Sequence, residues 1–148
     1  MKLTDRLAAI AVVFWVGGLW AMGAAAWILF GALGDKQLAG MLAGKLFSFI
    51  AYVGMVCGIY LIVFRLSRFG PSAMKQAFFW AALLMLLLTV AGHFGIQPIL
   101  ESLKAQAMPK EVMESIFRSR FQAWHGVSSI MYLVEGLLGL VLVLKPGK

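Results

Sequence analysis

The stretch FQAWHGVSSIMYLVEGLLGLVLVL, residues 121–144, indicates the fold most directly. Its 24 residues lie between Arg120 and Lys145 and would form a helix about 36 Å long, at ~1.5 Å per residue. Such a helix crosses a hydrocarbon core of ~30 Å with some tilt. The stretch therefore predicts a transmembrane helix.

The same helix has a polar side. At ~100° per residue, its polar side chains fall within a sector of roughly 140°. They are Gln122, His125, Ser128, Ser129, Tyr132 and Glu135. A spanning helix turns such a side toward protein, because a polar group left unsatisfied in hydrocarbon costs on the order of several kcal/mol. We therefore expect the function to lie along this side.

Three further stretches are long and apolar enough to cross a membrane. The chain is 62% hydrophobic, with a mean hydropathy of +0.91, which excludes an ordinary soluble domain. The expected spans cover residues 7–33, 46–64, 76–100 and 121–144. The sequence thus predicts one domain over residues 1–148, an all-α membrane protein built as an antiparallel four-helix transmembrane bundle.

The expected connections differ in length. A short loop bounded by glycines is expected from Gly34 to Gly44, and a basic loop from Arg65 to Lys75. Residues 109–120 are predicted to form an amphipathic helix that begins at Pro109 and precedes the fourth span. Basic residues are densest in the terminal segments and in the Arg65–Lys75 loop, so both termini are expected to be cytoplasmic.

The net charge of +7 does not predict nucleic-acid binding, because the basic residues flank spans and meet anionic lipid there. The lipid bilayer is the expected partner. Small-xxx-small repeats at Gly40–Gly44 and Gly54–Gly58 predict close helix packing. Such glycine-rich faces also permit a homo-oligomer or a membrane-protein partner.

The two histidines, His93 and His125, both lie in predicted spans, each about 6–10 Å below the outer boundary. Equal depth on antiparallel helices would suit a shared ligand, either haem b or a copper or zinc ion. The alternative is that each imidazole hydrogen-bonds a carbonyl, serine or glutamine within the bundle. No Cys or Asp lies nearby in sequence to complete a metal site.

Span three carries a second polar stripe, formed by Thr89, His93 and Gln97. We expect this stripe to face span four in one polar seam, with the histidines in the outer half and Glu135 deeper. A carboxylate in the bilayer is costly unless it is protonated or partnered, and Tyr132 lies one turn away. Glu135 is then either a proton carrier or ion ligand, or a structural tie.

Three classes of function remain open. They are haem or metal binding, a non-catalytic membrane assembly role, and a small proton-linked transporter that acts as an oligomer. Catalytic residues are not predicted, because the chain has no nucleophile–base–acid set, phosphate loop or CxxC pair.

Three motifs resemble a bacterial four-helix membrane family of unknown function, similar to transmembrane protein 205-like proteins. They are FWVGGLW at 14–20, AGMLAGKLF at 39–47 and FQAWHGVS at 121–128. Size and layout are also similar to copper-resistance D-like proteins and to small haem-binding, porphyrinogen-oxidising membrane proteins, which carry more histidines in their spans. The resemblance implies the bundle fold and the bacterial inner (plasma) membrane, and no established reaction.

Overall fold

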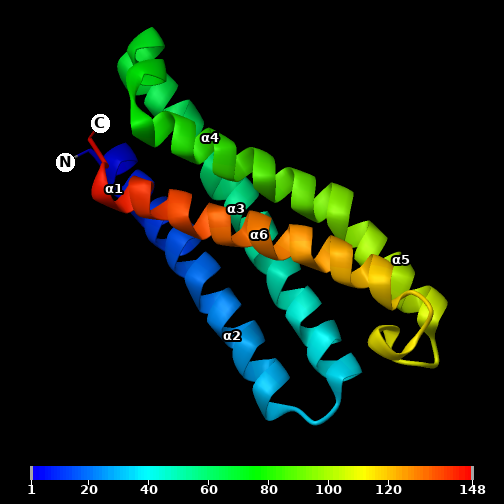
Figure 1. Cartoon of the computed structure of the whole chain (residues 1–148). Helices are drawn as coiled ribbons and strands as arrows, with labels where there is room; N and C mark the ends of the chain where they lie inside the picture. The colour runs from blue at the N-terminus through cyan, green and yellow to red at the C-terminus, as the bar shows by residue number, and fades with distance from the viewer. Residues whose placement is uncertain (1, 148) are drawn as a thin grey trace.

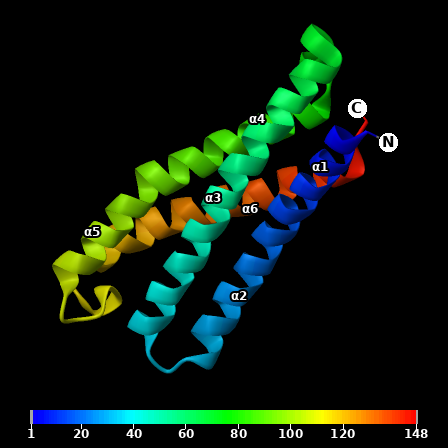
Figure 2. The ribbon, with the colours of Figure 1, turned by 180° about the vertical axis from the view of Figure 1, so that it is seen from behind.

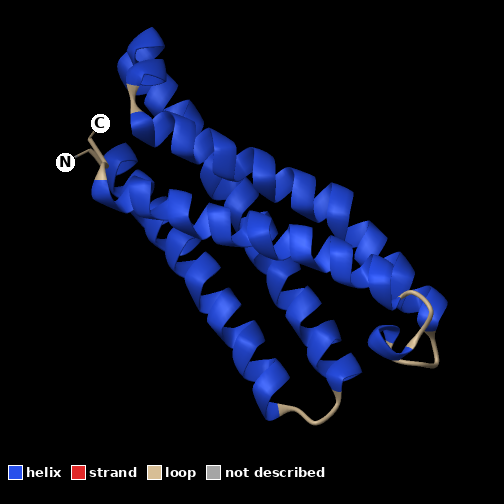
Figure 3. Ribbon diagram, in the orientation of Figure 1, coloured by secondary structure: helices blue, strands red, loops and turns tan. Residues whose placement is uncertain are grey.

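A computed structural model describes residues 2–147, which are almost entirely helical (Figure 3). Four helical segments are long and apolar enough to cross a membrane: Leu3–Ala32, Lys36–Lys75, Ala77–Ala107 and Arg118–Leu144. The predicted all-α membrane bundle is confirmed. The segments contain α1 (Leu3–Val12), α2 (Gly18–Ala32), α3 (Lys36–Phe69), α4 (Ala77–Val90), α5 (Gln97–Ala107) and α6 (Arg118–Leu144), with π-helical turns at Val13–Gly17 and Ala91–Ile96.

Successive segments run antiparallel, and both termini lie at one end of the bundle (Figure 1). α2 packs on α3, α3 on α4, and α4 on α6, while α6 also contacts α1 and α2. The ribbons of α2 and α6 diverge away from the termini in both views (Figures 1 and 2). The bundle is therefore closed at the terminal end and splayed at the other.

The second helix is longer than its predicted span. α3 begins at Lys36, so the expected loop from Gly34 to Gly44 is wrong over most of its length. The Asp35 side chain caps the helix by accepting hydrogen bonds from the backbone N–H groups of Gln37, at 2.9 Å, and Leu38, at 3.1 Å. The cap favours a helix that begins here, although glycines follow at positions 40 and 44. These glycines lie close to side chains of α5 and α2.

The predicted amphipathic helix over residues 109–120 is also wrong. α5 ends at Ala107, a single short turn covers Val112–Glu114, and α6 begins at Arg118. The Ser115 hydroxyl donates to the Val112 carbonyl at 2.7 Å and accepts from the Phe117 N–H at 3.2 Å. These local bonds compete with helical ones. The apolar residues instead pack on the end of α5 as a small cluster: Leu103, Ala107, Val112, Met113, Phe117 and Phe121.

The centre of the bundle is the indole ring of Trp15, which is fully buried. It lies against Gly54 and Gly58 of α3, where the glycines leave room for the ring. A Cβ at Gly58 would stand 2.9 Å from the Trp15 ring, and one at Gly54 would collide with its Nε1. The Gly54–Gly58 repeat thus holds an aromatic ring.

Two further glycines, on α2 and α6, also lie against aromatic rings, with a tight fit at Gly23 and ordinary contact at Gly136. Gly23 of α2 faces the Tyr132 ring of α6, and Gly136 of α6 faces the Trp20 ring of α2. Close helix packing in a membrane relies on shape, because lipid tails are as apolar as the side chains they would replace. These contacts determine the register of α2 relative to α6.

We expect Gly54→Ala to destabilise the protein by about 1–3 kcal/mol, since the added methyl group overpacks the Trp15 site. Unfolding in mixed detergent micelles measures the change. Gly31→Ala in α2 is the matched control, because a Cβ there meets no atom within 4 Å. Trp15→Leu should relieve the effect in the double variant. Additive losses in the double variant would contradict the Trp15 contact as the cause.

Candidate functional site

Glu135 of α6 and Thr89 of α4 form the buried part of the predicted polar seam. Each residue is only 6% exposed, and the Thr89 side chain lies near the Glu135 carboxyl. The Thr89 hydroxyl itself donates to the Met85 carbonyl one turn earlier, at 2.7 Å. Glu135 is thus held where α4 and α6 pack together, and Gly136 beside it lies against Trp20.

Tyr132 connects this pair to two other helices. Its hydroxyl donates to the Leu19 carbonyl of α2, and its ring meets Phe47 of α3 edge-on, with centroids 5.0 Å apart. It lies close enough to Glu135 for the two groups to interact electrostatically. Although Tyr132 lies one turn from Glu135, its hydroxyl donates to the Leu19 carbonyl, because α2 approaches at this level.

His93 lies in the π-helical turn between α4 and α5. Its ring packs edge-on against Tyr52 of α3, at 4.7 Å between centroids, and against Phe94, at 4.8 Å. Its Nδ1 atom is buried and makes no hydrogen bond within residues 2–147. An aromatic contact, rather than a polar one, therefore positions this imidazole.

His125 is exposed, in contrast to its expected place in the bundle interior. Its ring stacks on Phe121, with centroids 5.6 Å apart, and the Lys104 ammonium of α5 is close enough to act on it electrostatically. Its carbonyl accepts a hydrogen bond from the Ser129 hydroxyl at 2.8 Å. The imidazole itself stays accessible.

The two histidines differ in depth. Thr89 lies opposite Glu135, and Gly92 lies opposite Met131, so His93 is level with about residue 131 of α6. His125 is six residues away, which is about 9 Å along the axis. This offset does not suit one small shared ion. Within residues 2–147, no three His, Cys, Asp or Glu side chains gather as a metal site would require.

The outer part of the polar face of α6 is uncovered. Gln122, His125 and Ser129 are exposed, although at ~100° per residue they lie within about 80° of Tyr132 and Gly136, which contact α2. The cause is the divergence of α2, whose Trp27 is 80% exposed. Ser128 is half-buried on the adjacent side, and Gln97 of α5 is also half-buried.

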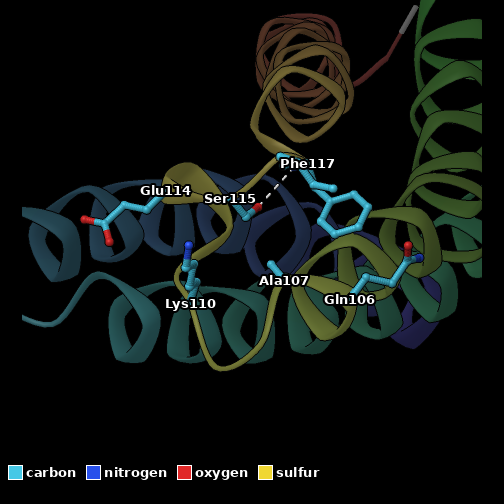
Figure 4. A pocket seen from close by; sticks show the side chains of 7 residues that line it. Gln106, Ala107, Lys110, Glu114, Ser115 and Phe117 are labelled. Carbon is cyan, nitrogen blue, oxygen red and sulfur yellow. Dashed lines mark hydrogen bonds between the residues drawn. The ribbon is translucent and has the colours of Figure 1, made fainter.

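A hollow of about 490 Å³ lies under the loop between α5 and α6 (Figure 4). Lys110, Glu114 and Phe117 are among its lining residues. Ile116 beside them is 93% exposed. The hollow is open and shallow, and the predicted site residues do not line it.

Arg65 is a buried charged residue that the sequence did not single out. It is only 4% exposed, and its guanidinium lies 3.8 Å from the centroid of the Phe78 ring. Nη1 donates to the Gln76 side-chain oxygen at 3.0 Å, and Nη2 donates to the Pro146 carbonyl. The signal in the sequence was an arginine directly after an apolar span, with Gln76 and Phe78 across a short turn.

The family model described as Domain of unknown function (DUF4149) matches residues 10–109 of the chain. The matched region covers most of the first helical segment, all of the second and third, and stops before α6. The residues Gln122 to Glu135 therefore lie outside it. No curated protein and no solved structure matches the chain.

Tyr132→Phe should lower stability by about 0.5–1.5 kcal/mol, because the hydrogen bond to the Leu19 carbonyl is lost while the ring still fills its place beside Gly23. Tyr52→Phe is the control, since the exposed Tyr52 contacts His93 through its ring face and edge only. Thermal unfolding in detergent compares the two. Equal losses would show that the Tyr132 hydroxyl does not tie α6 to α2.

Proposed function

We propose that this chain, which belongs to the DUF4149 family, is a non-catalytic membrane assembly protein that binds a second copy of itself through the polar face of α6. The observation that carries the proposal is the exposure of Gln122, His125 and Ser129 on a helix long and apolar enough to span the membrane. Polar groups in such a helix are costly in lipid unless another chain covers them.

A second copy suits this face because its side chains can pair with themselves. A glutamine amide donates and accepts hydrogen bonds, and the Ser129 hydroxyl, whose proton is used on the His125 carbonyl, can still accept one, so Gln122 residues of two copies related by a two-fold axis can pair with each other. The axis would run along the membrane normal, which keeps the equivalent residues of the two copies at equal depth. Bonds of this kind contribute about 0.6–2 kcal/mol each between membrane helices.

Haem binding is a second candidate, supported by the accessible imidazole of His125. His93 is the predicted partner ligand, and its Nδ1 lacks a hydrogen bond. If bound, haem would supply redox chemistry, and His125 would supply an imidazole ligand.

Cysteine cross-linking tests the assembly proposal. In a Cys57→Ser background, Gln122→Cys should form a disulfide-linked dimer on mild oxidation in native membranes, because Gln122 faces its symmetry mate. Val127→Cys, about 7.5 Å further along the axis and about 140° round the helix, should stay monomeric. Failure of Gln122→Cys to cross-link would contradict the dimer. If the purified Gln122→Cys protein then shows a Soret band, and the band is absent after His125→Ala, the result would favour haem binding.

The proposed location is a bacterial inner membrane with both termini in the cytoplasm. The two terminal segments and the α3–α4 connection meet at one end of the bundle. Together they hold six basic residues and one acidic residue, in the ranges 2–6, 65–75 and 145–147. The basic residues at this end lie in short segments, whereas those toward the other end are spread more widely along the chain, and a dense group of basic residues supports a cytoplasmic location. Reporter fusions after Lys148 and at Lys110 should therefore lie on opposite sides, with the first one cytoplasmic. Reversed or matching signals would contradict this orientation.

A further inference from the structure

Arg65 lies at the terminal end of the bundle, where the tail Lys145–Gly147 crosses it. The guanidinium has two hydrogen-bonding edges. Nη1 is occupied by Gln76 at 3.0 Å. Nη2 donates to the Pro146 carbonyl, whereas Nε, on the same edge, is buried and makes no hydrogen bond within residues 2–147. One neutral oxygen therefore covers an edge that can hold two.

The Nη2–Nε edge of Arg65 can bind a phosphate. A guanidinium presents paired N–H groups that bind two oxygens of one anion, and hydrogen bonds between charged groups are roughly twice as strong as neutral ones. The Pro146 carbonyl satisfies Nη2 alone and carries no net charge. A phosphate in its place would satisfy both Nη2 and Nε.

The surroundings favour an anion. Segments 2–6, 65–75 and 145–147 contain one acidic residue, Asp5, and Arg68 already pairs with it at 3.0 Å. The basic residues of the same segments are Lys2, Arg6, Arg65, Arg68, Lys75 and Lys145. The Tyr60 hydroxyl donates to the Thr4 carbonyl at 3.0 Å, which holds the N-terminal segment beside this cluster. Arg65 sits at the end of an apolar span, the level at which lipid headgroups lie.

We propose that Arg65 is a binding site for the headgroup phosphate of an anionic phospholipid, and that the tail Lys145–Gly147 covers this site until the lipid displaces it. The lipid phosphate takes Nη2 and Nε, and the Pro146 carbonyl is released. Gln76 and Phe78 keep the guanidinium in place during the exchange. The anionic lipid content of the membrane thereby sets the position of the C-terminal tail.

Spin labelling of the full chain tests this exchange. A nitroxide on Gly147→Cys, in a Cys57→Ser background, reports the mobility of the tail in nanodiscs. The label should be immobile in pure phosphatidylcholine. It should become mobile when half of the lipid is phosphatidylglycerol. Equal mobility in the two lipids would overturn the proposal, and this comparison needs no change at Arg65.

Two variants separate the guanidinium from general basic charge. Arg65→Lys keeps the charge but loses the paired N–H edge, so the response of the label to lipid should disappear. Arg68→Lys, whose partner is Asp5, should keep the response. Native mass spectrometry measures the phosphatidylglycerol that stays bound to each variant. Its affinity for Arg65→Lys should be about tenfold lower than for the unchanged protein, which is equivalent to ~1.4 kcal/mol. Equal loss in both variants would refute a specific site.

Inorganic phosphate distinguishes the source of the anion. Added to phosphatidylcholine nanodiscs, it should leave the label immobile, because a lipid headgroup is held at this level by its acyl chains and free phosphate is not. Release by phosphate alone would overturn the assignment to lipid.

Discussion

The bundle depends on the fit of one buried ring, that of Trp15, against two glycines of α3. Water does not drive helices together inside a bilayer, so the packing must come from complementary shape. Trp15 fills the space that Gly54 and Gly58 leave, and Trp20 and Tyr132 lie against Gly136 and Gly23. These contacts hold the first helical segment against both α3 and α6. Beyond the last of these contacts, α2 diverges from α6 (Figure 1).

The splayed end follows from this arrangement and defines the candidate site. Tyr132 is the last residue of the polar face of α6 that α2 covers, through the bond to the Leu19 carbonyl. Beyond it, Gln122, His125 and Ser129 are exposed. Glu135 lies on the covered side of this boundary and is buried with Thr89. α6 therefore carries both a buried polar residue, Glu135, and an accessible polar face.

The two ends of the molecule are held differently. At the terminal end, Arg65 joins α3 to the start of α4 and to the C-terminal tail, and Arg68 joins α3 to α1. At the other end, Lys104 and Glu101 of α5 form an ion pair at 3.2 Å beside Gly40 and Gly44 of α3. The small-xxx-small repeat at Gly40–Gly44 thus lies against an ion pair in ordinary contact, whereas the repeat at Gly54–Gly58 is required by the Trp15 ring.

Hydropathy and helical periodicity were sufficient to predict the four spans, their antiparallel order and the polar side of α6, because lipid permits few backbone structures. They also identified Glu135 as a buried acid. The relative depth of His93 and His125, the exposure of His125 and the burial of Arg65 depended on the register between helices, and side-chain contacts such as Trp15 on Gly58 set that register. The loop before α6 depended on hydrogen bonds of Ser115 that compete with an amphipathic pattern. Periodicity gives the side of a helix on which a residue lies, whereas only packing determines which neighbour covers it.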